Sequence, residues 1–151
     1  MEMRNALRSK SMCSAILWLS CVLLFVVVAS DKTRGENNLP LTQNYRGFEL
    51  SVVSFERAGN SYKARFFEHR ASQGEELIVV HMVIRYLDAK EKLEIKRFEL
   101  HGVNDRKGET SLTSITIPAK PGEYPQKIVF RIHKGTKLKA FQIEDILFDL
   151  Q

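Results

Sequence analysis

The chain has 151 residues and a net charge of +5, which is long enough for one domain with its own apolar core. Its two cysteines, Cys13 and Cys21, both lie in an N-terminal apolar segment. The rest of the chain can therefore form neither a disulfide framework nor a thiolate metal site. From Asp31 onward there are 20 Lys and Arg against 17 Asp and Glu, and this small excess does not predict a nucleic-acid partner.

Residues 1–30 have the composition of a targeting segment. Basic residues, among them Arg8 and Lys10, precede a run from Ser11 to Ser30 that carries no charged side chain. A helix of that length spans about 30 Å, the thickness of a bilayer core. Because the basic residues come first, we expect the N-terminus in the cytoplasm and the rest of the chain outside the membrane.

Three fates of this segment are open. It can remain as a signal anchor that crosses the membrane through residues 11–30. It can be a signal peptide cleaved near Ser30, because Val28, Ala29 and Ser30 are small enough for a signal peptidase. It can also be a lipoprotein signal with Cys21 acylated. The predicted location is extracytoplasmic, either single-pass membrane-anchored or secreted.

Residues 31–46 are polar and include Gly35, Asn37 and Pro40, which is typical of a flexible linker. From Gly47 onward, short apolar runs alternate with turn signals, so we place the folded domain at 47–151. No amphipathic helix is evident there. The strands predicted from the alternation are 48–55, 62–66, 77–86, 93–100, 115–117, 128–132 and 138–150.

The strongest of these strands lies within 74–88. Read with period two, it has one wholly apolar face, which runs from Ile78 to Tyr86, and one mixed face, which includes His81. Such a strand belongs in the middle of a sheet, with one face in the core and the other partly covered. The pattern predicts an all-β fold, an immunoglobulin-like β-sandwich of about seven strands preceded by an N-terminal hydrophobic helix.

Three stretches carry a resemblance to a known family. They are Gly-Glu-Glu-Leu-Ile-Val-Val-His-Met-Val-Ile-Arg-Tyr at 74–86, Phe-Glu-Leu-His-Gly-Val-Asn-Asp-Arg-Lys-Gly-Glu at 98–109, and Lys-Pro-Gly-Glu-Tyr-Pro-Gln-Lys-Ile-Val-Phe-Arg-Ile-His-Lys-Gly at 120–135. With these, 47–150 resembles the immunoglobulin-like domain of unknown function found in bacterial exported lipoproteins and surface proteins. That domain is related to a small secreted mycobacterial immunogenic antigen. The resemblance implies a sandwich fold and supplies no catalytic residues.

Candidate sites for chemistry are sparse. The sequence has no Gly-x-Ser-x-Gly turn and no paired acid and base, so we expect neither an enzyme nor a cofactor. Four histidines are present, and paired strands could bring two of the candidates His81, His101 and His133 together as a metal site, with Met82 or an acid nearby. Without a His-x-His or close acid spacing, the expectation is that no metal is bound.

Two groups of basic residues are candidates for contact with an unknown protein or an anionic polymer. They are Lys90, Lys92, Lys96 and Arg97, and Lys134, Lys137 and Lys139. The sequence thus predicts a non-catalytic extracytoplasmic binding module of the cell envelope or surface. A histidine-based metal-binding or enzymatic exported domain is the first alternative. A structural accessory subunit of a membrane complex is the second.

Overall fold

The computed structural model describes residues 39–151 as a chain of strands with one short 3-10 helix, η1 (Val103–Asp105). The strands in chain order are β1 (Leu41–Tyr45), β2 (Phe48–Gly59), β3 (Ser61–Lys63), β4 (Glu68–Arg70), β5 (Glu75–Tyr86), β6 (Leu93–Ile95), β7 (Phe98–Gly102), β8 (Lys107–Gly108), β9 (Ile115–Ile117), β10 (Glu123–His133), β11 (Leu138–Ile143) and β12 (Ile146–Asp149).

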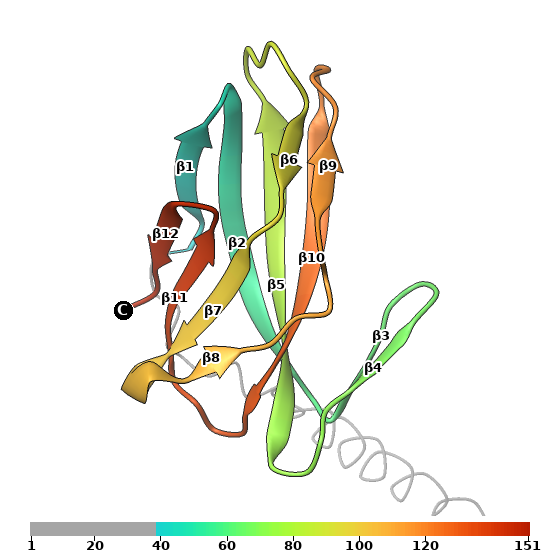
Figure 1. Ribbon diagram of the computed structural model, residues 1–151, viewed down its shortest axis with the longest axis vertical. Coiled ribbons are helices and arrows are strands. Elements are labelled where there is room, and N and C mark those ends of the chain that lie inside the picture. The colour runs from blue at the N-terminus through green and yellow to red at the C-terminus, as the bar shows by residue number, and fades with distance from the viewer. Residues whose placement is uncertain (1–38) are drawn as a thin grey trace, which may run out of the picture. The chain divides into compact units, whose positions relative to one another are not determined.

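Two four-stranded sheets form the body of the domain. The first has the order β1-β2-β5-β10 and the second the order β12-β11-β7-β8. The ladders within both sheets are antiparallel. The sheets face each other, and two further ladders, β3-β4 and β6-β9, extend from them (Figure 1). The predicted all-β sandwich is confirmed.

One core joins the two sheets, and β5 contributes the row that the alternation predicted, from Ile78 to Ile84. Strands β2, β7, β10 and β11 contribute matching rows because every second side chain points inward. Phe141 lies at the centre, where its ring is 6.4 Å from that of Phe55, 6.0 Å from that of Phe130 and 6.1 Å from that of Phe148. The buried cluster extends from Phe48 to Phe148, so residues 39–151 contain a complete core.

The opposite face of β5 is buried at one end as well. Leu77 is 1% and Val79 0% exposed, although alternation points both away from the main core. Val79 is paired with Val129 of β10, and Leu77 is paired with Arg131. This matches the prediction that the second face of the strand is mixed and partly covered.

The folded domain begins earlier than the predicted boundary at Gly47, because part of the predicted linker 31–46 is a strand. Leu41–Tyr45 forms β1 and pairs with β2, with Leu41 opposite Val52 and Tyr45 opposite Phe48. The sequence of β1 shows no alternation of apolar and polar residues, because β1 is an edge strand whose middle residues are polar and exposed.

The strand predicted at 93–100 is in fact two strands, β6 and β7. It breaks at Lys96 and Arg97, whose backbone N–H groups both donate to Oε1 of Glu144, at 2.5 and 3.2 Å. Strand β6 then pairs with β9 and β7 with β11. The phase shift in the sequence therefore marks a change of sheet partner.

The N-terminal hydrophobic helix and the cleavage or acylation sites predicted within residues 1–30 lie outside the described residues. Within 39–151, none of the helical structure is long and apolar enough to cross a bilayer.

Candidate interaction surface

A two-stranded arm stands out from the sandwich between β2 and β5 (Figure 1). We define the arm as residues 60–71. Its strands β3 and β4 pair with Tyr62 opposite His69, and the two rings lie 6.4 Å apart. The turn is closed by the N–H of Ala64, which donates to the carbonyl oxygen of Phe67 at 2.8 Å. The strand predicted at 62–66 is confirmed only for Tyr62 and Lys63, since β3 ends at Lys63.

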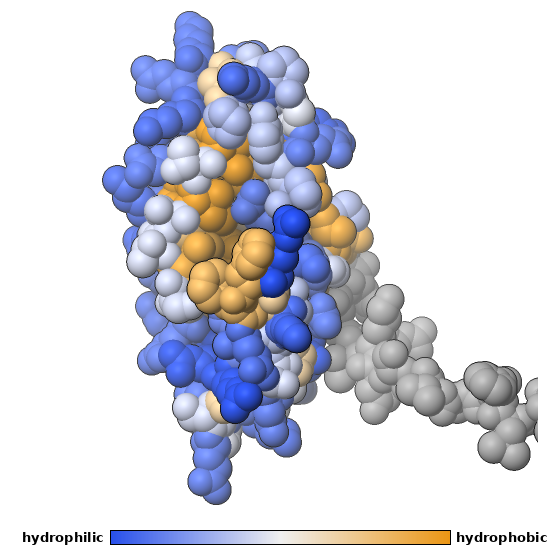
Figure 2. All heavy atoms as spheres, turned by 90° about the vertical axis from the view of Figure 1, so that its right-hand side faces the viewer, coloured by the Kyte–Doolittle hydropathy of each residue, from blue (hydrophilic) through white to orange (hydrophobic). Residues whose placement is uncertain are grey.

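The tip of the arm, residues 64–67, carries two aromatic side chains into solvent. Phe66 is 78% and Phe67 72% exposed, the highest fractions among the large exposed apolar residues of the described chain. Figure 2 shows apolar side chains projecting toward the viewer in the middle of this face, beside strongly hydrophilic ones. Turn positions normally favour Gly, Asn, Asp or Ser, so two Phe side chains here are not explained by the turn.

The charges of the arm are mainly positive. Lys63, Arg65 and Arg70 are cationic and Glu68 is acidic. Glu68 is paired with Arg70, whose Nη2 lies 3.0 Å from Oε2. The guanidinium carbon of Arg65 lies 5.3 Å from the centre of the Phe66 ring, within cation–π range. The arm is therefore an exposed aromatic tip with cations beside it.

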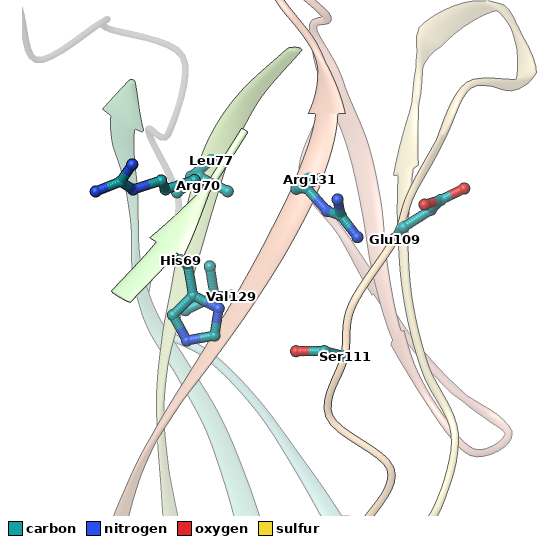
Figure 3. Close-up of a pocket in the computed structure, with 7 residues that line it drawn as sticks. All are labelled: His69, Arg70, Leu77, Glu109, Ser111, Val129 and Arg131. Atoms are coloured by element: carbon teal, nitrogen blue, oxygen red, sulfur yellow. The ribbon is translucent and has the colours of Figure 1, made fainter. Parts of the chain in front are cut away.

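A small open pocket of about 190 Å³ lies at the base of the arm. Two of its residues, Leu77 and Val129, are apolar and belong to β5 and β10 of the first sheet. The others are polar or charged and come from the arm, from β10 and from the segment after β8 (Figure 3). They are His69, Arg70, Glu109, Ser111 and Arg131.

The pocket exists because the chain changes sheets at Glu109. Its N–H donates to the carbonyl oxygen of Arg131, and the N–H of Arg131 donates to the carbonyl oxygen of Glu109, both at 2.7 Å. This bridge joins the segment after β8, in the second sheet, to the edge of β10, in the first. Leu77, Arg131 and Glu109 thus form one row on the outer face of the first sheet.

Three residues of the pocket, Ser111, His69 and Glu109, are of the types found in hydrolase triads. A working triad needs the nucleophile hydrogen-bonded to the histidine and the histidine to the acid. In the described part of the chain no hydrogen bond links any two of them, and the Glu109 carboxylate points away from His69 (Figure 3). The pocket has cations and an apolar floor, which suits an anion attached to an apolar group.

The outer face of the first sheet carries cross-strand ion pairs. The Arg85 guanidinium lies between Glu49 and Glu123, at 3.0 and 2.7 Å, and these acids hold the pKa of Arg85 above its ordinary value, Glu123 most strongly. Nε2 of His81 lies 3.1 Å from Oε2 of Glu56. These ion pairs join neighbouring strands on the same face of β5 as the buried Leu77 and Val79.

On the second sheet the corresponding cluster is centred on Glu99. Its carboxylate accepts hydrogen bonds from Nε of Arg97 at 2.8 Å and from Nζ of Lys107 at 3.2 Å. The bond from Arg97 contributes most to holding the pKa of Glu99 below its ordinary value, and Lys107 adds to it. Nε2 of His101 lies 3.2 Å from Oε2 of Glu99, but without the alignment of a hydrogen bond.

The structure keeps the candidate histidines apart. His81 lies on β5 of the first sheet and His101 on β7 of the second, while His133 is the exposed last residue of β10. Each pairs, if at all, with a different acid or carbonyl group. Within residues 39–151 no group of three or more His, Cys, Asp and Glu is placed to hold a metal ion.

The structure does not gather the two basic groups, and Lys90 and Lys92 lie at the opposite end of the first sheet from Lys134. Lys90 and Lys92 follow the end of β5, whereas Lys134 follows the end of β10. Because β5 and β10 are antiparallel with Glu75 opposite His133, these loops are at opposite ends of the first sheet. The other members are Lys96 and Arg97, paired with Glu94 and Glu99, and Lys137 and Lys139, before and within β11.

The features that sequence reasoning missed are the arm tip and the pocket. Phe66 looked like the inward residue of a strand because it continues the Tyr62, Ala64 alternation. A signal was present in the adjacent Phe67, because two neighbouring residues of a strand cannot both face the core. The pocket residue Arg131 had no such signal.

No protein family matches the sequence, and no curated protein matches it either. Two solved structures share the fold. One is a conserved hypothetical protein from Bacillus anthracis, with a TM-score of 0.54 and 17% identity, covering 75% of this chain and 94% of its own. The other is an uncharacterised β-sandwich protein from Clostridium difficile, with a TM-score of 0.50 and 9% identity, covering 76% of this chain and 92% of its own. The chain is thus similar in fold to bacterial β-sandwich proteins.

Proposed function

We propose that the chain is a non-catalytic extracytoplasmic interaction module that docks through the arm, residues 60–71. The observation that carries this proposal is the exposure of Phe66 and Phe67, at 78% and 72%, on an element that projects from the sandwich. Exposed aromatic side chains are enriched where one surface meets another. The other large apolar side chains exposed in the described chain, Val53, Leu87 and Leu147, are less exposed, at 44%, 45% and 54%.

The extracytoplasmic location rests on the sequence. The uncharged run from Ser11 to Ser30, with basic residues before it, is the feature of an export signal or an anchor. The resemblance of residues 47–150 to the domain of exported lipoproteins and surface proteins supports the same location. The relationship to the mycobacterial antigen stays a prediction from the motifs at 74–86, 98–109 and 120–135.

Export is tested by labelling one exposed cysteine in intact cells. The described domain has no cysteine, and Leu147 on β12 is 54% exposed, so Leu147→Cys adds an accessible thiol. We expect a membrane-impermeant maleimide to label this variant in intact cells. The unaltered chain, with Cys13 and Cys21, sets the background. Labelling that requires permeabilised cells contradicts the proposal.

Docking through the arm is tested by photo-crosslinking in the same cells. A photoreactive phenylalanine analogue in place of Phe66 is expected to form an adduct with a macromolecule or a lipid. The same analogue in place of Leu147 is the matched control, because that position is also apolar and exposed but lies on the second sheet. Equal adducts at the two positions, or none at either, contradict the arm as the docking element.

A further inference from the structure

We infer that the surface on which the arm docks is an anionic phospholipid bilayer, with Phe66 and Phe67 inserted at the boundary between headgroups and acyl chains. This rests on the proposed function in one respect, that the arm is the docking element. It goes further in naming the chemistry of the partner.

The tip has the side chains that a bilayer interface selects. A Phe ring is favourable at the acyl boundary, and amphipathic anchors place Phe there beside basic residues. Phe66 and Phe67 project from a turn whose backbone is closed by the bond from Ala64 to Phe67. The two rings can therefore enter the interface while the hydrogen bond of the turn stays made, which an apolar medium requires.

The cations are placed to meet lipid phosphates. Lys63 precedes the tip and Arg65 lies within it, and in the described chain neither forms an ion pair with an acid. Arg65 lies over the Phe66 ring, so its guanidinium would stay near the headgroups when the ring enters. Each such cation adds attraction to an anionic leaflet.

The depth of the arm fits the layers of a bilayer. β4 rises about 3.3 Å per residue, so His69 and Arg70 lie roughly 7–10 Å behind Phe67. The headgroup layer on each side of a bilayer is roughly 5–8 Å thick. With the tip at the acyl boundary, the pocket formed by His69, Arg70 and Arg131 would lie at the outer edge of the headgroups. Its cations and its Leu77 and Val129 floor suit a phosphate that carries an apolar group.

The first strand of the domain begins midway along β2 and runs away from the arm. β1 is antiparallel to β2, with Leu41 opposite Val52, and β2 leads on to the arm after Gly59. Going back from Leu41 therefore leads toward the arm end. Residues 31–40 separate the uncharged run from β1, and they reach no more than roughly 36 Å when fully extended. A chain anchored through residues 11–30 would hold Leu41 within that distance of the membrane, and the arm end lies about seven residues, roughly 23 Å, further along β2.

The test is vesicle flotation of a fragment of residues 31–151, which contains the complete core. The vesicles are equal parts phosphatidylglycerol and phosphatidylcholine, or phosphatidylcholine alone. We expect the fragment to float with the anionic vesicles and to bind at least tenfold less to the neutral ones. Raising the salt concentration should weaken the binding, because it screens the arm cations.

Two pairs of variants separate docking by the arm from general charge attraction. Phe66→Ser with Phe67→Ser should weaken binding to anionic vesicles at least tenfold, whereas Leu147→Ser should leave it unchanged. Lys63→Gln with Arg65→Gln should weaken binding roughly fivefold for each cation. Lys90→Gln with Lys92→Gln removes the same charge at the opposite end of the sandwich and should have a much smaller effect. Circular dichroism and the urea midpoint confirm that each variant is folded.

The inference is overturned if the folded fragment does not bind the anionic vesicles, or if the arm and control variants bind equally. In either case, a photo-crosslink from position 66 to a protein would leave the proposed function standing with a protein as the partner. Failure of the proposed function is recognised separately, by maleimide labelling of Leu147→Cys that needs permeabilised cells.

Discussion

The Arg57 guanidinium donates at once to the Glu76 carboxylate and, at 2.7 Å, to the carbonyl oxygen of Thr136. The same Glu76 oxygen accepts the backbone N–H of Gly135 at 2.8 Å. Glu76 is only 7% exposed, so the pair ties the ends of β2 and β5 to the loop between β10 and β11. This is the end of the sandwich from which the arm emerges.

Breaking this pair should destabilise the domain more than breaking a surface pair. Arg57→Met leaves the buried Glu76 carboxylate without its charged partner, and we expect a loss of about 2–3 kcal/mol, since Arg57 itself is partly exposed. Arg85→Met is the control, because Arg85 also bridges two carboxylates but on the exposed face, where the loss should be about 1 kcal/mol or less. Urea unfolding at neutral pH measures both, and equal losses would contradict the assignment of Arg57 as a structural clamp.

Glu99 should make the stability of the domain depend on pH in the acid range. Its pKa is lowered in the folded state, mainly by the hydrogen bond from Arg97. A lowered pKa adds stability above the unfolded value of about 4.3, and that stability is lost as the pH falls through the folded pKa. The urea midpoint of the unaltered domain should therefore exceed that of Glu99→Gln at pH near 7, and the gap should close in acid. A difference in urea midpoint that does not change with pH would show that the ion pairs of Glu99 do not stabilise the folded domain.

Gly47 should tolerate no side chain. It has a φ of +80° in the turn between β1 and β2, and an added Cβ would lie 2.5 Å from Cα of Ala89. Gly47→Ala combines backbone strain with a clash, so we expect a loss of about 2–5 kcal/mol. Gly59 is the control, with a φ of +70° and open space around it, and its loss should be about 1–2 kcal/mol. Thermal and urea unfolding measure the stability of the two variants. Similar losses of stability would contradict the close packing of Gly47 on Ala89.

Phe141 should be the most sensitive aromatic side chain. It is fully buried, and its ring lies against rings from both sheets, so Phe141→Ala should cost about 3–5 kcal/mol or prevent folding. Phe66→Ala removes the same atoms from a position 78% exposed and should change stability by less than about 0.5 kcal/mol. Chemical unfolding gives both values. A large loss on altering Phe66 would mean that the arm tip packs onto the domain.

The parts of the fold that could be predicted are those in which one strand carries its own pattern. The β5 row from Ile78 to Ile84 is an example, because its alternation alone identifies the inward face. β1 could not be found, since an edge strand with exposed polar residues such as Gln43 has no alternation. The break between β6 and β7 depends on Glu144, which is distant in sequence.

The candidate surface was harder to predict than the fold. Residues 62–66 were predicted to be one strand because Tyr62 and Phe66 are an even number of residues apart. The structure has a turn from Ala64 to Phe67 instead. The pocket gains Glu109 and Ser111 through the pairing of Glu109 with Arg131 of β10, a contact between sheets that periodicity does not encode. The basic residues predicted for partner binding, such as Lys90 and Lys134, were readable as charges, but their separation by the length of the sheet was not.

The most direct test of the account is to report the depth of the arm tip in a bilayer. An environment-sensitive fluorophore is attached to Phe66→Cys, or to Leu147→Cys as the control, in the fragment of residues 31–151. With vesicles of equal parts phosphatidylglycerol and phosphatidylcholine, the probe at position 66 should shift to the blue and be quenched by lipids that carry a nitroxide near the headgroup. The probe at position 147 should remain in water. A probe at position 66 that stays as aqueous as the control while the folded fragment is mixed with these vesicles would contradict the account.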